Sequence, residues 1–416
     1  MYLSTSRAAD MAGGTPVPSG PLRAVPGTVF ALGLVSLITD VSAEMVTAVL
    51  PLYLVAGLGM SPLAFGALDG LHQGATALLR LAGGRISDRT HRRKLVAGFG
   101  YALSAGCKAA LLAVTTPWSV AAVLAADRTG KGLRTAPRDA LISLSCPPQD
   151  QGRAFGVHRA LDTAGALLGP LAAFGVLWVV ADGYAAVFTV SCCIAVLGVV
   201  VLVLFVREAP APAPAARAPL PPPVHTLVRI PGLRRLCATA AVLGLFTVGD
   251  AFLYLLLQHR LDLPAAYFPL LPVGTAAVFL LAALPAGRAA DRLGRRRVFL
   301  GGHVLLLGAC LLLLAPVPAG PPLVLGVLGL LGLFYAATDG VLMAAAGPLL
   351  PPGLRTTGLA VLQTAQALAR FAGSLLFGVA WTLWGPGPAL GIAAGGLLLS
   401  LAVVAVFGGR EPGGLS

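Results

Sequence analysis

Ionisable side chains inside long apolar runs are the residues of this chain with the most evident chemistry. In the run at 118–143, Arg128, Lys131, Arg134 and Arg138 recur at steps of three, three and four, so a helix places them on about one third of its surface. A charged group near the centre of a bilayer costs about 2.5–3.5 kcal/mol and is retained where it pairs or lines a polar passage. Arg128 lies about 15 Å into the run and Arg138 about 30 Å. We therefore predict that Arg128 and Lys131 face a polar cavity, whereas Arg138, and with it Arg134, extends toward the membrane surface.

Two carboxylates lie one turn apart in the first apolar run. Asp40 and Glu44 share a helical face about 20 Å into that run, too deep for their short side chains to reach water outside the membrane. Two adjacent carboxylates in a low-dielectric site resist being ionised together, which suits groups that bind and release a proton. The alternative is structural pairing with Arg128 or Lys131. The two roles are compatible, because a proton on the acid would free the base to hold an anion. Asp127, four residues before Lys131, is within pairing reach of the same stripe.

The elements that must hold these side chains are membrane-spanning helices. The chain has 416 residues, of which 57% are hydrophobic and 11% charged, and its mean hydropathy is +0.87. That composition is typical of an integral membrane protein, and apolar runs near twenty residues favour helices over barrel strands. We predict an all-α membrane protein with twelve transmembrane helices in two pseudo-symmetric six-helix bundles. The apolar runs lie at 27–57, 64–86, 95–116, 118–143, 154–180, 184–206, 234–258, 265–286, 298–316, 322–346, 357–382 and 389–408.

The net charge of +13 is concentrated in alternate gaps between these runs. Basic residues gather at Arg89–Lys94, Arg207–Arg235 and Arg288–Arg297, while the other gaps hold almost none, with Arg260 the main exception. This alternation follows the positive-inside rule and places the basic gaps and both termini in the cytoplasm. We therefore predict a multi-pass protein of the inner (plasma) membrane. The absence of a single polar basic face argues against nucleic-acid binding.

An internal repeat divides the chain into two halves. The segment Gly84–Lys94 (GRISDRTHRRK) returns as Gly287–Arg297 (GRAADRLGRRR), and Asp250 occupies the place in the second half that Asp40 has in the first. Two parallel halves are one architecture of secondary transporters. Asp250 is therefore a third candidate for proton coupling, and Tyr254, one turn beyond it, is the best aromatic candidate for a cavity.

The predicted segments follow from the repeat and from a proline-rich stretch between the halves. This stretch contains Ala-Pro repeats and Pro221–Pro223, a composition typical of a semi-rigid polyproline II spacer. The segments are a cytoplasmic N-terminal tail (1–26), a six-helix bundle (27–206), a cytoplasmic linker (207–233), a second six-helix bundle (234–408) and a cytoplasmic C-terminal tail (409–416).

The repeated basic segment resembles the loop motif of the major facilitator superfamily, G-x-x-x-D-R-x-G-R-K/R-x, and the resemblance covers nearly the whole chain. The second copy fits fully, while the first has His91 where a glycine is usual. The resemblance implies a cytoplasmic latch between the halves in the outward-facing state, with the aspartates at helix ends and the arginines against neighbouring helix termini. A basic loop that only sets topology is the alternative. The implied gate residues are Gly84, Asp88, Arg89, Arg92, Gly287, Asp291, Arg292 and Arg295.

Two further segments refine the resemblance. Asp127–Asp139 reads DRTGKGLRTAPRD and is similar to a bacterial subgroup with D-R-x-G-K-G-x-R-x-A-P-R-D, most of whose members have no assigned substrate. Gly165, Gly169 and Pro170 resemble the G-x-x-x-G-P core of the antiporter motif, although the double glycine that should follow is replaced from Leu171 onward. The partial motif favours export, and ordinary close packing of helices through small residues is the alternative.

The arrangement of the superfamily implies a place for each of these residues, because helices 1, 4, 7 and 10 line its central cavity and helices 2, 5, 8 and 11 line the interface of its halves. The proton-coupling candidates are then Asp40, Glu44 and Asp250. The substrate cavity would be lined by Asp127, Arg128, Lys131, Tyr254 and Asp339. The half-domain interface would hold Arg159, Asp162, Gly165, Gly169, Pro170 and Arg370, whose charged members would form salt bridges that break and re-form as the halves rock. His158 is suited equally to titrate near neutral pH or to pack.

We therefore predict a secondary active transporter that works by alternating access and couples protons to the export of a small polar or anionic compound. The alternatives are proton-coupled uptake of an organic anion and a non-transporting membrane sensor on the same fold. The sequence has no phosphate-binding loop, zinc-spaced histidine pair or nucleophile elbow, so we expect no enzymatic activity, cofactor or metal. The expected partners are a small-molecule substrate, protons and the lipid bilayer, and we expect a monomer.

Overall fold

The structure is a computed structural model that describes residues 26–70, 92–146, 151–181, 183–206, 229–346, 349–350 and 355–407. Every regular element in these ranges is helical, which confirms the predicted all-α class. The first copy of the basic motif, with Gly84, Asp88 and Arg89, lies outside the described residues, as do most of the predicted linker and tails. The roles predicted for those segments stay predictions.

The first half contains helices that match the predicted runs. The helix α1 (Gly27–Leu52) continues into a π-helical turn, η1 (Tyr53–Gly57), and a further helix covers residues 62–70. Then follow α3 (Arg93–Leu111), α4 (Pro117–Leu144), α5 (Gln151–Val179) and α6 (Tyr184–Phe205). The start of α4 is capped, because the Thr116 hydroxyl accepts the backbone N–H of Ser119 at 3.3 Å and Pro117 takes the first helical position.

The second half contains more helices than predicted runs. Its elements are α8 (Pro231–Leu245), α9 (Asp250–Leu261), a 3₁₀ turn η3 (Ala265–Tyr267), α10 (Leu270–Leu293), α11 (Arg295–Leu314), α12 (Pro321–Thr338), α13 (Val341–Ala346), α14 (Arg355–Trp384) and α15 (Pro386–Phe407).

Two of the predicted runs are each broken into two helices. Residues 246–249 separate α8 from α9 within the run at 234–258, and Asp339 and Gly340 separate α12 from α13 within the run at 322–346. Gly249 precedes α9 in an extended conformation, with φ −63° and ψ 140°. The apolar sequence continues through both breaks, so hydropathy alone does not reveal them. Non-helical backbone at membrane depth is tolerated where it is buried in protein or lines a cavity.

Nine helical segments within the described residues are long and apolar enough to cross a membrane. This confirms a multi-pass membrane protein. The helices α3 and α4, with 19 and 28 residues, also have the length that a crossing requires. The complete set of twelve spans stays a prediction.

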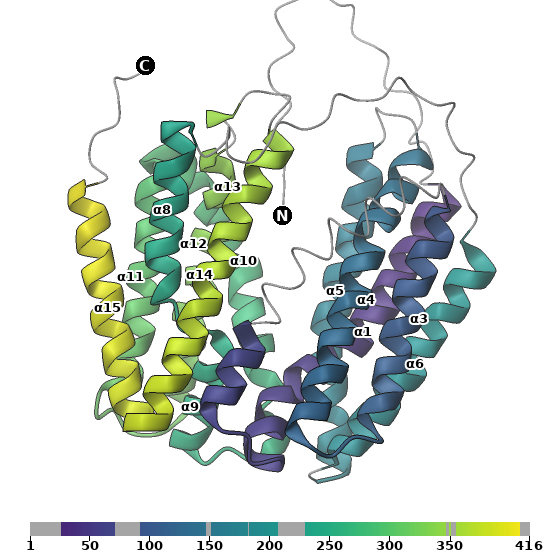
Figure 1. Ribbon diagram of the computed structural model, residues 1–416, viewed down its shortest axis with the longest axis horizontal. Coiled ribbons are helices and arrows are strands. Elements are labelled where there is room, and N and C mark those ends of the chain that lie inside the picture. The colour runs from purple at the N-terminus through teal and green to yellow at the C-terminus, as the bar shows by residue number, and fades with distance from the viewer. Residues whose placement is uncertain are drawn as a thin grey trace, which may run out of the picture.

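The helices form two groups that lie side by side (Figure 1). In the first group α1 packs against α5 and α6, and α3 packs against α4 and α6. In the second group α12 packs against α10 and α11, and α14 packs against α8 and α15. The groups contact each other where α5 meets α10 and η3 and where α1 meets α9. Figure 1 shows that they lie closest at the end that holds α9 and diverge toward the opposite end.

Aromatic side chains fill the region where the two groups meet. Phe174 and Trp178 of α5 contact Tyr267 of η3, with ring centroids 5.9 and 5.7 Å apart. Phe65 makes an edge-to-face contact with Phe252 of α9, with centroids 5.0 Å apart. Each such pair contributes about 0.5–1.5 kcal/mol beyond the burial of its area. The charge pattern predicts that this end faces outward, so the two halves are packed together at their predicted external end.

Arg260, the basic residue that departs from the charge pattern, binds the backbone at the end of α11. Its guanidinium donates to the carbonyl oxygens of Leu313, Ala315 and Val317 at 2.5, 2.6 and 2.6 Å. The last carbonyls of a helix have no partner within it. Arg260 therefore ties α9 to the loop that follows α11.

We expect Arg260→Met to lower the free energy of unfolding by about 1.5–3 kcal/mol, because it removes charge-assisted hydrogen bonds to backbone carbonyls. Thermal unfolding of the purified protein in detergent measures the effect. The exposed neighbour His259 provides the control, since His259→Met leaves those carbonyls bound. Equal unfolding temperatures for the two variants would contradict the proposed role of Arg260.

Two glycines allow α5 to pack closely on α1. A Cβ atom on Gly169 would lie 2.7 Å from the Cβ atom of Glu44 and 2.8 Å from the carbonyl oxygen of Val41. A Cβ atom on Gly165 would lie 2.5 Å from the carbonyl oxygen of Leu37. These distances are shorter than ordinary van der Waals contact, so only glycine fits without movement of α1. Gly165 and Gly169 thus join two helices of the same half.

Gly169→Ala is expected to destabilise the protein by about 1–3 kcal/mol, because the added methyl group forces α1 away from α5. Gly175→Ala is the matched control on the same helix, since a Cβ atom there meets no atom within 4 Å. That control is expected to be neutral or to stabilise by up to about 1 kcal/mol through helix propensity. Chemical unfolding in mixed micelles compares the two, and similar values for both would show that the α1–α5 contact is loose.

Candidate functional site

A cavity of about 350 Å³ lies between the two groups of helices. Both groups contribute lining residues, and the lining is mostly apolar with a few polar side chains, the usual character of a small-molecule site. The apolar part includes Leu50, Leu54, Phe65, Leu124, Phe268 and Pro272. The polar part consists of Glu44, Thr47, Asp69, Thr247, Asp250, Tyr254, Tyr335, Arg370 and Ser374.

Polar side chains on the wall formed by the second half contact one another or the first half. The hydroxyl of Ser374 on α14 donates to Oδ2 of Asp69 at 2.9 Å, which joins the two halves. The hydroxyl of Tyr254 on α9 donates to the Thr275 hydroxyl of α10 at 2.9 Å. The Tyr335 side chain of α12 lines the same cavity as Asp250. The two hydrogen bonds hold their polar groups in fixed positions around the cavity.

The break between α8 and α9 forms part of the cavity wall. Thr247, Val248 and Gly249 line the cavity with a backbone that is not helical, and Asp250 follows as the first residue of α9. A helix N-terminus carries a partial positive charge that favours an acidic side chain in its first turn. Discontinuous helices of this kind form the binding sites of many secondary transporters. The break therefore explains why Asp250 can face the cavity.

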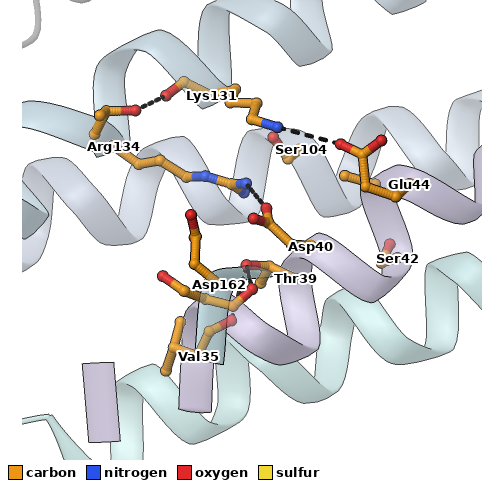
Figure 2. A network of polar contacts seen from close by, with 12 residues as sticks. Val35, Thr39, Asp40, Ser42, Glu44, Ser104, Lys131, Arg134 and Asp162 are labelled. Carbon is orange, nitrogen blue, oxygen red and sulfur yellow. Dashed lines mark hydrogen bonds and ion pairs between the residues drawn. The ribbon is translucent and has the colours of Figure 1, made fainter. Parts of the chain in front are cut away.

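Two of the basic side chains of α4, Lys131 and Arg134, are paired with acids of α1 (Figure 2). Nζ of Lys131 lies 3.6 Å from Oε1 of Glu44, and Nη2 of Arg134 lies 3.4 Å from Oδ1 of Asp40. The Arg134 guanidinium also lies over the Tyr101 ring of α3, 4.4 Å from its centroid. Arg134 is only 4% exposed, so its expected extension toward the membrane surface is wrong. Its partners come from α1 and α3, which the sequence of α4 alone does not reveal.

Arg138 is likewise held inside the first half. Its guanidinium lies 3.0 Å from the carboxylate of Asp139 and 3.6 Å from that of Asp162 on α5, and donates to the Ser36 hydroxyl at 3.2 Å. The side chain is 11% exposed, so the expected extension of Arg138 is also wrong. Ser36 lies 2.9 Å from Nε2 of His158, which is buried, and this contact favours packing over titration for the histidine.

A third group of charges is buried between α3 and α4. Lys108 and Asp127 form an ion pair whose side chains are 4% and 8% exposed. Nη2 of Arg128 donates to the Thr47 hydroxyl of α1 at 3.2 Å, and Nε of Arg128 has no hydrogen-bond partner. Thr47 lines the cavity, so Arg128 lies directly behind the cavity wall.

The structure separates the predicted site residues into those that line the cavity and those behind it. Glu44, Asp250 and Tyr254 line it, and so do Pro170 and Arg370, which were predicted at the interface of the halves. Asp40, Asp127, Arg128 and Lys131 do not line it, although Asp127 and Lys131 border a second, small pocket within the first half. Asp339 is exposed at the break between α12 and α13.

The remaining interface candidates lie within one half. Arg159 is exposed and lies 3.7 Å from Asp162 on its own helix, and Gly165 and Gly169 contact α1 as described above. Hydrogen bonds from other described residues connect the halves, from Ser374 to Asp69 and from the N–H of Leu63 to the Thr382 hydroxyl at 3.1 Å, in addition to the aromatic contacts.

The second copy of the basic motif contacts helix ends. Gly287, Asp291 and Arg292 lie in the last turns of α10, and Nη1 of Arg295 donates to the carbonyl oxygen of Ala344 in α13 at 2.7 Å. The neighbouring Arg296 donates to Val404 of α15 at 2.8 Å. In the first half Arg92 precedes α3, and Lys94 donates to Val203 of α6 at 3.0 Å. Each of these contacts lies within one half.

Three residues that line the cavity were not predicted from the sequence, namely Asp69, Tyr335 and Ser374. Asp69 was not predicted as a site residue, because nothing in its neighbourhood marks it. Tyr335 and Ser374 were not assigned because single polar residues in apolar helices are common. For the break between α8 and α9, a signal was present in the sequence Thr247-Val248-Gly249-Asp250, in which a glycine and an acid interrupt an apolar run. Within the described ranges, no group of histidine, cysteine and acidic residues could hold a metal ion.

Comparison with known proteins agrees with this architecture. The Major Facilitator Superfamily matches the chain over residues 32–279 and 236–415. An uncharacterised MFS-type transporter of Methanocaldococcus jannaschii is 28% identical over 368 residues, which cover 87% of this chain and 90% of that protein. The multidrug resistance protein MdtH of Cronobacter sakazakii is 32% identical over 117 residues, 28% of this chain and 29% of that protein.

Similarity of fold extends to solved transporters. The crystal structure of the nucleoside transporter NupG covers 92% of this chain and all of its own chain, with a TM-score of 0.78 and 13% sequence identity. At that identity the similarity shows the fold alone. The two groups of helices around a cavity, the repeated basic motif and the family match together identify the chain as a member of the Major Facilitator Superfamily of membrane transporters.

Proposed function

We propose that the protein is a secondary active transporter that exports a small polar compound in exchange for protons by alternating access. The observation that carries the proposal is the cavity between the two halves, to whose lining one half contributes Glu44 and the other contributes Asp250 and Arg370. The proposal places a monomer in the plasma membrane with both termini in the cytoplasm.

Glu44 is the proposed proton-coupling residue. It lines the cavity, its side chain is 26% exposed, and it lies 3.6 Å from Lys131. A proton on Glu44 removes its attraction for Lys131, so protonation at the cavity wall changes the contact between α1 and α4. Asp40 and Arg134 form the next pair along the same two helices and would respond to the same movement. Asp250 lines the wall that the second half contributes.

The arrangement of the halves corresponds to one state of the transport cycle. Aromatic contacts join the halves at the predicted external end, and the helices diverge toward the predicted cytoplasmic end. We interpret this arrangement as the inward-facing state, in which the cavity takes substrate from the cytoplasm. Breaking the aromatic contacts would then open the external side.

Export is favoured over uptake on two grounds. The chain has the G-x-x-x-G-P core of the antiporter motif on α5, and a short part of it is similar to a multidrug resistance protein. The expectation of an anionic substrate depended on the basic side chains of α4 facing the cavity. The basic side chains of α4 do not line the cavity, and Lys131 and Arg134 are paired with acids of α1, so they do not support uptake of an organic anion.

Proton release measured on membrane vesicles of both orientations tests the proposal. Everted vesicles that hold an acidic interior are given amines, organic acids and neutral polar compounds in turn, and a pH-sensitive dye reports loss of the gradient. We expect one class of compound to release protons from everted vesicles with the wild-type chain and not with Glu44→Gln. Compound-driven proton movement only in right-side-out vesicles would show uptake. No response in either orientation to any of the three classes would favour the non-transporting sensor.

A further inference from the structure

A further pocket, of about 50 Å³, lies between α14, α15 and residues 245–248 at the break between α8 and α9. Leu376 of α14 and Ile392 of α15 line it and are 54% and 51% exposed, so the pocket opens at the surface of the second half. Both helices are long and apolar enough to cross a membrane. The exposed side chains on them face hydrocarbon, so the pocket is a groove continuous with the lipid-facing surface, here called the membrane-facing groove.

The membrane-facing groove lies a short distance inside the membrane from the predicted external end. The helix α15 begins at Pro386, and Ile392 lies about 9 Å further along its axis. Trp384, the last residue of α14, is 59% exposed, and an exposed tryptophan at the end of a spanning helix is typical of the membrane–water interface. The groove is therefore at the depth of the upper part of the acyl chains in the nearer leaflet.

Small apolar residues form the inner part of the membrane-facing groove. Ala380 of α14 and Ala389 and Ala393 of α15 line it and are 6%, 1% and 8% exposed, so they lie below the exposed Leu376 and Ile392. Thr247 has the one polar side chain among the described residues of the lining, and its hydroxyl donates to the carbonyl oxygen of Leu243 at 2.9 Å. The groove thus presents a recess of hydrocarbon character to the membrane.

The break between α8 and α9 separates this groove from the central cavity. Thr247 and Val248 line both of them, so the break is a partition only one strand of backbone thick. Its backbone is not helical and is held in place by packing on its two sides. Atoms that line an unfilled recess lose dispersion contacts, so an occupant of the groove stabilises the residues that lead into Asp250.

We propose that the membrane-facing groove binds one acyl chain of a phospholipid from the leaflet at the predicted external end, and that this chain supports the break between α8 and α9. A volume of about 50 Å³ admits a short stretch of a single chain. The lining is apolar, so the groove selects hydrocarbon and makes no contact with a headgroup. This inference does not rest on the proposed function, because binding of a lipid chain requires neither a substrate nor protons.

Photochemical labelling from the lipid tests the proposal on the full-length protein in phosphatidylcholine vesicles. A small fraction of the phosphatidylcholine has a diazirine in the upper part of one chain, and peptide mass spectrometry locates the side chains to which that chain becomes attached. Leu325 is the reference, because it is 71% exposed and lies about 6 Å from the start of α12, at a similar depth but outside the groove. Attachment at Ile392 is expected to exceed attachment at Leu325 about fivefold, which corresponds to roughly 1 kcal/mol of preference.

Variants that fill the groove assign the labelling to it. Ala393→Phe is expected to lower attachment at Ile392 to the level at Leu325, and Ala389→Leu is a second filling variant. Ala402→Phe places the same ring on the exposed face of α15 and is the matched control. Phospholipid added to the protein in detergent is expected to raise the unfolding temperature of Ala402→Phe more than that of Ala393→Phe, because only the former keeps its groove open to a lipid chain. The unfolding temperature without lipid shows that each variant is folded.

Three results would overturn the proposal. The first is equal attachment at Ile392 and Leu325 in the wild-type chain, and the second is unchanged attachment at Ile392 in the folded filling variants. The third is an equal response of Ala393→Phe and Ala402→Phe to phospholipid, which would show that the chain does not support the break. Loss of the labelling at Ile392 when the ratio of protein to lipid is raised would show that a second copy of the protein covers the groove, and the lipid proposal would fail.

Discussion

Replacing Lys108 with methionine will lower the free energy of unfolding by about 3–5 kcal/mol, because it leaves a buried carboxylate without its main partner. Lys108 and Asp127 pair between α3 and α4, with side chains only 4% and 8% exposed. The next nearest cation, Nε of Arg128, lies 4.0 Å from Asp127 and has no hydrogen bond to it. Equilibrium unfolding in mixed micelles with increasing denaturing detergent measures the loss.

A double replacement separates this electrostatic effect from simple loss of packing. When both charges are removed in Lys108→Met with Asp127→Leu, most of the stability is expected to return, because no buried charge remains. Arg159→Met is the control for loss of an arginine pair near the surface, since Arg159 is 66% exposed, and it is expected to change stability little. A double variant as unstable as Lys108→Met alone would show that the ion pair itself is not the cause.

Glu44→Gln is expected to abolish the proton-driven accumulation of a transported compound in everted vesicles while leaving the protein folded. A pH difference of one unit is worth about 1.4 kcal/mol per proton, which supports a concentration ratio of about tenfold for each coupled proton. Glutamine cannot take up and release a proton, so the ratio should fall to one. Accumulation of a transported compound in everted vesicles, measured at steady state with an imposed gradient, gives this ratio directly.

Two further variants, one at the partner of Glu44 and one at a distant carboxylate, complete that test. Lys131→Gln leaves Glu44 able to titrate and should retain some accumulation, while Asp262→Asn removes an exposed carboxylate elsewhere and should retain all of it. Compound-driven exchange without a gradient should persist in Glu44→Gln, because exchange needs no net proton movement. Full accumulation by Glu44→Gln would move the coupling role to another acid, with Asp250 the first candidate.

The sequence was sufficient for the class of fold because each helix depends on a local property. Apolar runs near twenty residues locate α6, α11 and α15 closely, and the repeated basic motif identifies two related halves. The pairing of Glu44 with Lys131 was also among the stated alternatives, since both residues lie at similar depth in their runs.

The breaks and the partners of the buried charges could not be predicted in this way. Hydropathy averages over a window, so four residues at 246–249 disappear within the apolar sequence around them. Arg134 contacts Tyr101 of α3 and Asp40 of α1. These partners lie on two other helices, and only the packing of α1, α3 and α4 brings the three residues together. Asp69 contacts α14 about three hundred residues later in the chain, and no local pattern encodes that contact.

The charge pairs of α1, α3, α4 and α5 also constrain how the protein can change over generations. Loss of Lys108 or Arg134 alone strands an acid inside the first half, whereas exchange of both partners restores neutrality. We therefore expect related sequences to vary at these positions two at a time, with the lysine or arginine and its acid inherited or lost together.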